Sequence, residues 1–158
     1  MTRVKGFSLI ELLIVVAIIL IIAAIAVPSY LHARIDANES SAVGSVRTIN
    51  SAEIAYSSAY PTVGFAGNLA SLGGTSCNPP SSSSSCMIDT LLAGGLKSGY
   101  TFTMQGASGT PNSSYQFIAT PNVWDVSGIR YFCSFQDAVV RYSLNAISTC
   151  DASIPSLN

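Results

Sequence analysis

The chain has 158 residues, a formal net charge of −1 and only 9% charged residues. This length allows one domain with a modest core and one additional element. The low charge content and a mean hydropathy of +0.45 argue against a free soluble enzyme and favour a protein partly buried in lipid or in an assembly. Because no basic cluster follows the first few residues, the sequence indicates no nucleic-acid site.

An almost uninterrupted apolar segment occupies residues 7–27, in which only Ser8 and Glu11 are polar. As an α-helix this segment would be about 31 Å long, which matches the roughly 30 Å hydrocarbon core of a bilayer. Two basic residues precede the segment, whereas acidic and basic residues are mixed on its other flank. The positive-inside rule therefore predicts a membrane-spanning helix whose amino terminus lies in the cytoplasm.

Three interpretations of this segment explain only part of the pattern. A secretory signal would be cleaved after Ala24-Ile25-Ala26, but the apolar run exceeds the usual length of about 7–15 residues, and Glu11 and Pro28 fit it poorly. A plain membrane anchor accounts for the hydrophobicity and the orientation but leaves Glu11 unexplained. A buried core helix is disfavoured because a domain of this size rarely surrounds such a long apolar helix on all sides.

The residues around Gly6 support a fourth interpretation. Gly6 precedes the sequence FSLIE (7–11) and follows two basic residues on the cytoplasmic side. This arrangement resembles the class III leader of type IV pilins and their pseudopilin relatives, and the resemblance extends over about residues 1–30. It implies that residues 1–6 are a leader peptide, that a prepilin peptidase cleaves between Gly6 and Phe7, and that the new terminal amine of Phe7 is methylated.

Glu11 needs a partner, because an unpaired carboxylate in lipid costs several kcal/mol. Cleavage after Gly6 would give Phe7 a cationic amine four positions before Glu11, and the two groups could pair within one helix or between subunits. Breaking a buried pair is costly even where forming it gains little, so misaligned subunits would be disfavoured. Pilins place a glutamate at this fifth mature position, which supports Glu11 as the residue that sets the register of assembly. The alternative is an interfacial acid that faces lipid headgroups.

The helix is predicted to continue to about Ala59, with residues 7–28 in the membrane or the filament core and residues 29–59 as an amphipathic half. Apolar residues recur near the helical period, and charged residues lie between them. The apolar positions are Leu31, Ile35, Ala42, Val46, Ile49 and Tyr56, and the charged ones are Asp36, Glu39, Arg47 and Glu53. Pro28, the third residue assigned to assembly after Phe7 and Glu11, is expected to kink the helix. The resemblance adds an alternative, in which the helix before Pro28 unwinds on assembly.

All four cysteines lie after the apolar segment, which predicts disulfides formed in an oxidising compartment. Three pairings are possible, and we favour Cys77–Cys86 and Cys133–Cys150, because each closes a local loop around turn-forming residues. The chain has one histidine and no Cys-x-x-Cys pair, so no metal site is predicted.

Residues 60–158 are predicted to form a globular head. Residues 60–85 are rich in Ser, Gly and Pro, which is typical of a loop, and residues 87–96 could form a short helix. Four later segments have the composition of half-buried strands: residues 100–104, 115–119, 130–135 and 139–143. They predict an α+β fold in which a four-stranded antiparallel sheet, in hairpin order, packs on the long helix to give the ladle shape of pilins.

No catalytic set indicates an enzyme. The only imidazole, His32, lies just beyond the apolar helix, and the sequence contains no phosphate-binding loop or paired-carboxylate motif. We therefore expect neither enzymatic activity nor a cofactor.

The resemblance implies instead a structural subunit of a type IV pilus. The precursor would cross the inner membrane once, meet the prepilin peptidase/N-methyltransferase, and be assembled by an inner-membrane platform into an extracellular homo-oligomeric filament for adhesion, motility or DNA uptake. A type II secretion pseudopilin is the first alternative, although the sequence lacks the acidic ligand set of the calcium-binding major pseudopilin. A monomeric membrane-anchored binding protein is the second alternative.

Overall fold

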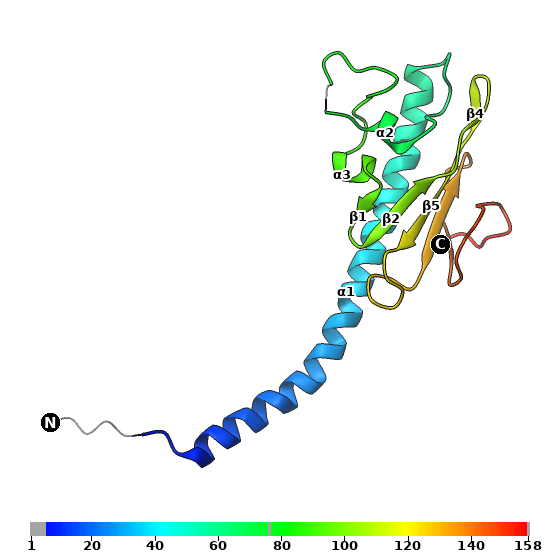
Figure 1. The fold of residues 1–158 in the computed structure, drawn as a ribbon. Helices are drawn as coiled ribbons and strands as arrows, with labels where there is room; N and C mark the ends of the chain where they lie inside the picture. The colour runs from blue at the N-terminus through cyan, green and yellow to red at the C-terminus, as the bar shows by residue number, and fades with distance from the viewer. Residues whose placement is uncertain (1–5, 76, 158) are drawn as a thin grey trace. The chain divides into compact units, whose positions relative to one another are not determined.

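The structure is a computed structural model that describes residues 6–75 and 77–157. It divides into two compact units, Met1–Arg34 and Ile35–Asn158. One helix, α1 (Leu9–Ala59), forms the described helical part of the first unit and continues into the second (Figure 1). The prediction of a helix over residues 7–59 is therefore confirmed, except that Phe7 and Ser8 precede its first residue.

Pro28 lies inside α1, and the residues on both sides of it are helical. A proline removes one backbone donor and crowds the preceding turn, but a helix can continue past it by bending. In this single chain the segment before Pro28 is thus helical. Its unwinding on assembly concerns the filament and stays a prediction.

The second unit contains a five-stranded antiparallel sheet with strand order β1-β2-β5-β6-β7. Its strands are β1 (Leu96–Lys97), β2 (Tyr100–Met104), β5 (Gln116–Pro121), β6 (Tyr131–Phe135) and β7 (Arg141–Ser143). A separate hairpin, β3 (Ser108–Gly109) and β4 (Asn112–Ser114), lies between β2 and β5 in the sequence. The predicted α+β fold class is confirmed.

All four predicted strands are present, with bounds within two residues of those expected. The predicted number of strands was too low, because β1 has only two residues and no alternation can be recognised over so short a segment. The predicted helix over residues 87–96 is reduced to α3 (Thr90–Ala93). Gly94 and Gly95 end it, and Gly95 has a φ of +77°, which favours glycine.

Residues 60–85 are not entirely a loop, since they contain the single-turn helix α2 (Leu69–Leu72). Asn68 caps this turn by accepting a hydrogen bond of 2.9 Å from the backbone N–H of Ser71. Leu69 and Leu72 are buried in the core of the head, which explains why a turn of helix forms within a polar segment.

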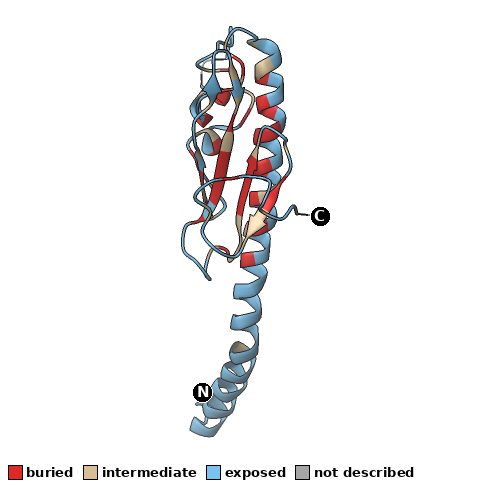
Figure 2. Cartoon of the chain, turned by 90° about the vertical axis from the view of Figure 1, so that its right-hand side faces the viewer, coloured by how far each residue is buried: buried red, intermediate tan, exposed pale blue. Residues whose placement is uncertain are grey.

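A stripe of seven α1 side chains is buried in the second unit, and its members are spaced alternately by four and three residues. They are Ile35, Glu39, Ala42, Val46, Ile49, Glu53 and Tyr56. Figure 2 shows these buried positions of α1 beside the buried residues of the sheet. Such spacing produces one narrow helix face, which here packs on aromatic side chains of β2, β5 and β6.

The sequence analysis placed five of these seven residues on the buried face, but it made two errors. Leu31 is 47% exposed and belongs to the first unit, outside the compact unit that contains the sheet. Glu39 and Glu53 were expected between the apolar positions, whereas both lie within the stripe and are 4% and 0% exposed. Their carboxylates find partners on segments far away in the sequence.

The Glu39 carboxylate connects α1 to the segment that precedes β6. Its Oε1 accepts hydrogen bonds from the backbone N–H groups of Ile129 (2.8 Å) and Arg130 (2.9 Å), and its Oε2 forms an ion pair with the Arg130 guanidinium. Burial acts to raise the pKa of Glu39, but these hydrogen bonds and the charge of Arg130 outweigh it and hold the pKa below its usual value. Glu39 is therefore ionised and fully partnered in the head.

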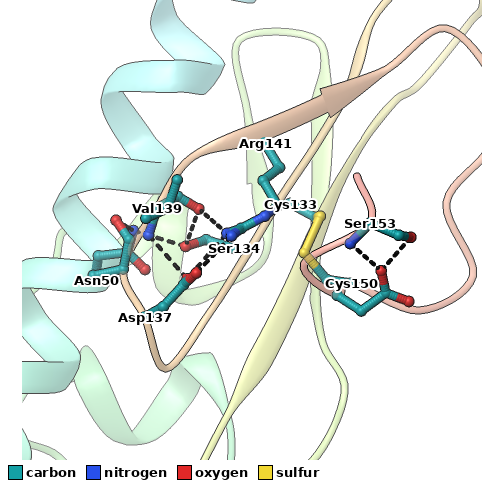
Figure 3. Close-up of polar contacts among 10 residues, drawn as sticks. Asn50, Cys133, Ser134, Asp137, Val139, Arg141, Cys150 and Ser153 are labelled. Carbon is teal, nitrogen blue, oxygen red and sulfur yellow. Dashed lines mark hydrogen bonds and ion pairs between the residues drawn. A yellow bond between two sulfur atoms is a disulfide. The ribbon is translucent and has the colours of Figure 1, made fainter. Parts of the chain in front are cut away.

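Asn50 makes a second polar connection from α1 to the sheet. Its Nδ2 donates to Ser134 Oγ (2.9 Å) and to the carbonyl of Ala138 (3.1 Å), and its Oδ1 accepts from the Tyr115 hydroxyl (3.1 Å). Figure 3 shows Asn50 facing the turn between β6 and β7. The amide thus fixes how this turn lies on the helix, because every polar atom of its side chain is satisfied there.

Two disulfides close local loops of the second unit. Cys133 of β6 is joined to Cys150 of the carboxyl-terminal segment (Figure 3), with their Cα atoms 5.9 Å apart. Cys77 is joined to Cys86 across the serine-rich loop, with a Cα separation of 5.8 Å. These are the two disulfides that were predicted from the sequence because each closes a local loop.

Glu53 is the least satisfied polar residue of the stripe. Its Oε2 accepts a hydrogen bond of 2.8 Å from the backbone N–H of Ala66, while its Oε1 is buried and has no partner among the described residues. Burial raises the pKa of Glu53 to about 7, although the Ala66 hydrogen bond acts in the opposite direction. The Glu53 carboxyl therefore binds a proton more tightly in the folded head than a solvent-exposed glutamate does.

We predict that Glu39→Gln lowers the free energy of unfolding by about 2–3 kcal/mol, because Arg130 loses its ionic partner. Urea unfolding of the full chain in detergent, followed by the fluorescence of the single tryptophan, measures this loss. Asp36→Asn is the matched control, since Asp36 is an exposed acid on the same helix. Equal losses from both substitutions would show that Glu39 makes no specific contribution.

We further predict that Glu53 makes stability depend on pH. Because the folded pKa lies above the unfolded one, the folded head binds the proton more tightly, and its stability falls as the pH rises from about 4.5 to about 7. The difference amounts to at most about 3 kcal/mol. Glu53→Gln should remove most of this dependence and be more stable than the wild type above neutral pH. An unchanged pH profile would contradict the assignment.

Candidate processing and assembly segment

Residues 6–8 form a non-helical segment that leads into a helix. Gly6, Phe7 and Ser8 are exposed and non-helical, and α1 begins at Leu9. The first helical hydrogen bond runs from the N–H of Leu12 to the carbonyl of Ser8 (3.2 Å). The peptide bond between Gly6 and Phe7 therefore lies outside the helix and is exposed.

Among the described residues, none packs against Gly6. A methyl group added to its Cα would meet no described atom within 4 Å. The described part of the chain therefore shows no packing reason for a glycine at this position.

Glu11 caps the first turn of α1. Its Oε2 accepts a hydrogen bond of 3.4 Å from the backbone N–H of Ser8, which is one of the two hydrogen bonds of a Ser-x-x-Glu capping box. The sequence analysis missed this role of Ser8, although the four-residue pattern was a sufficient signal. Phe7 still carries a peptide nitrogen in this chain, so the pairing of its free amine with Glu11 belongs to the processed form and stays a prediction.

The apolar part of α1 is exposed on every side. Its large hydrophobic side chains from Phe7 to Leu31 are all between 45% and 80% exposed. Within the described residues, α1 is the one helix that is long and apolar enough to cross a membrane. A helix that is hydrophobic all round needs lipid or other helices as its surroundings.

The described residues contain no group of three or more His, Cys, Asp or Glu side chains that could hold a metal ion. The features that the structure does provide at this end of the chain are an exposed non-helical segment, a capped helix start and a bare apolar surface.

Comparison with known families gives one match. Residues 1–27 match the family model described as the prokaryotic N-terminal methylation motif. The matched region includes Gly6, Phe7 and Glu11 and ends directly before Pro28. Neither the curated proteins nor the solved structures give a significant match to this chain.

We predict that Gly6→Val blocks processing, because the side chain would obstruct a peptidase that contacts the backbone at this position. The intact mass of the chain after co-expression with a prepilin peptidase measures the loss of the leader. Gly44→Val is the matched control, since Gly44 of α1 also has no neighbour within 4 Å of an added methyl group. Normal cleavage of the Gly6 variant would refute the assigned site.

Proposed function

Because the chain carries the class III leader of type IV pilins and pseudopilins, we propose that it is a structural subunit of a type IV pilus. A leader of this class implies processing by a prepilin peptidase and assembly into pili. In the proposed maturation, cleavage after Gly6 exposes Phe7, whose amine is methylated. The processed subunit then leaves the inner membrane and enters an extracellular filament with the help of an assembly platform in that membrane.

The observation that carries the proposal is the bare apolar helix behind the cleavage site. Its exposed side chains are aliphatic around the whole circumference, so one neighbouring helix would cover only part of the surface. A bilayer covers it before assembly, and a bundle of identical helices covers it afterwards. A filament core provides such a bundle, and an anchored monomer does not.

Glu11 gives the bundle a defined register. In the processed chain the Phe7 amine is the nearest new cation. In a filament, the Glu11 carboxylate of one subunit can form an ion pair with the Phe7 amine of an adjacent subunit. A subunit inserted in another register would leave one or both charges unpaired in an apolar surrounding, which costs several kcal/mol. The hydrogen bond to Ser8 is weak at 3.4 Å, and so the carboxylate can exchange it for an ionic partner at small cost.

The head supports an extracellular, structural role. It has its own core and two disulfides, and these cross-links fit an oxidising compartment. We propose no enzymatic activity for it. Head-to-tail repetition that does not close into a ring produces a fibre, with the heads as its outer surface.

Surface appendages sheared from cells test the proposal. We expect long fibres that contain this chain, with a peptide that begins at methylated Phe7 by mass spectrometry. If the fibres are all short and depend on a secretion system, the chain is a pseudopilin. A chain that keeps Met1, or that begins after Ala26, would disprove the maturation.

We predict that Glu11→Ala reduces the number of filaments about tenfold or more, because the register of incoming subunits is lost. Electron microscopy of sheared fibres gives the number, and mass spectrometry shows that cleavage after Gly6 is retained. Glu11→Gln, which keeps the shape and the cap but not the charge, should be nearly as defective. A normal filament number in Glu11→Gln would assign the residue to helix capping alone.

A further inference from the structure

The loop between β5 and β6 presents three large apolar side chains to the surroundings. Val123, Trp124 and Val126 are 56%, 58% and 53% exposed, and they flank the exposed Asp125. We call residues 123–126 the apolar loop; it is gold in Figure 1. Trp124 is the only tryptophan of the sequence. Clustered exposed apolar groups of this kind mark interaction surfaces more often than isolated ones do.

The apolar loop is held rigidly. The backbone N–H groups of Val126 (3.3 Å) and Ser127 (2.9 Å) both donate to the carbonyl of Val123, and the N–H of Asp125 donates to the carbonyl of Gly128 (3.0 Å). The Ser127 hydroxyl donates to the Val123 carbonyl and accepts from the Val123 N–H, each over 3.0 Å. The apolar side chains are therefore fixed outward by the loop itself, which lowers the entropic cost of binding through them.

The base of the loop is fixed to the rest of the head. The Asn38 amide donates to the carbonyl of Ser127 (2.9 Å), which connects the loop to α1 near the point where α1 enters the head. Gly128 packs so closely on the Tyr100 ring that any Cβ there would overlap it. The loop thus occupies one defined position at this end of the head.

A shallow groove lies further along α1. It is lined by Arg47, Thr48, Ser51, Ala52 and Ala55 on the helix and by Met87 from the segment after the Cys77–Cys86 loop. The helix side chains next to Arg47 are small, so a bulky group can approach the helix backbone there. The thioether of Met87 supplies a soft apolar wall of the kind that packs well on aromatic rings.

The groove contains the one basic side chain of the head that lacks an ionic partner among the described residues. Residues 35–158 include four basic side chains, and three of them form ion pairs inside the head: Lys97 with Asp89, Arg130 with Glu39, and Arg141 with Asp137. The fourth, Arg47, is exposed. Asp125 in the apolar loop is likewise an exposed acid without such a partner in the described part of the chain. The two surfaces therefore carry opposite unpaired charges.

We propose that the apolar loop of one copy docks into the α1 groove of a second copy, with Trp124 against Met87 and Asp125 paired with Arg47. This inference rests on the proposed filament and specifies one contact between its heads. A single buried aromatic anchor beside a desolvated ion pair is typical of the residues that dominate interface energies. The remaining interface would come from the apolar helices.

The apolar loop and the groove lie at different positions along α1. A contact between them therefore joins copies that are shifted along the helix axis, and the same contact can be repeated with further copies. The loop is attached at Asn38, and the groove is centred near Ser51, 13 residues later on the same helix. That separation corresponds to roughly 20 Å along the helix axis. Two copies joined in this way are displaced along α1, and the first copy keeps a free groove while the second keeps a free loop. Such a heterologous contact propagates.

A charge exchange tests the contact in cells that make the full chain. Asp125→Arg and Arg47→Asp should each reduce the number of filaments about tenfold, whereas the double substitution should restore them. Asp36→Arg is the matched control: it reverses an exposed acid outside both surfaces and should leave the number unchanged. All variants should retain the peptide that begins at Phe7, which shows that processing is intact. Failure of the double substitution to recover, or normal filaments in both single variants, would overturn the docking.

The fluorescence of Trp124 distinguishes two possible contacts of the apolar loop, namely the groove of a second copy and the membrane. We expect a blue-shifted emission that is protected from iodide in purified filaments. In liposomes that hold the precursor, we expect an exposed emission that brominated lipids do not quench. Quenching by brominated lipid, or an exposed tryptophan in filaments, would overturn the proposal. If the wild type forms no filaments at all, the proposed function itself fails, and that result is distinct from wild-type filaments that ignore the charge exchange.

Discussion

The organisation of this chain depends on one helix that meets two different surroundings along its length. The first part of α1 is apolar on all sides and exposed, whereas the second part buries a single stripe against a sheet. A helix with no polar face can be stabilised only by lipid or by similar helices. A helix with one buried stripe can support an independent head. The change between these two patterns is what allows a single chain to have an apolar end for assembly and a separately folded domain.

The stripe is unusual because it contains two carboxylates, those of Glu39 and Glu53, in an otherwise apolar surface. Glu39 is fully partnered by backbone N–H groups and by Arg130, and Asn50 lies beside the stripe with its own set of partners. Apolar contacts alone would allow the sheet to slide along α1 by one turn at moderate cost. A buried carboxylate with specific donors permits one position, since any shift would leave it unsatisfied. Polar residues in the stripe thus fix the position of the sheet on the helix.

Both parts of α1 carry a carboxylate that needs a partner, but the partners differ. Glu11 caps its own helix in the unprocessed chain and is expected to meet a cation only after cleavage, while Glu39 has its cation within the chain. The head pairs three of its four basic side chains internally and leaves Arg47 exposed beside a groove. Charges that are satisfied within the chain stabilise its own fold, whereas Arg47 is available for the contact between copies that we propose.

The sequence by itself determined the features that depend on neighbouring residues. These are the apolar helix, the leader motif, the class of the fold and the approximate bounds of the four main strands, because periodicity, capping and short motifs are local properties. Only the tertiary structure showed that Glu39 and Glu53 lie on the buried face of α1. It also added the two-residue strand β1. A charged residue is predicted to be exposed unless its partner is known. The backbone donors to Glu39 lie about 90 residues away in the sequence. Only the folded chain brings such partners together.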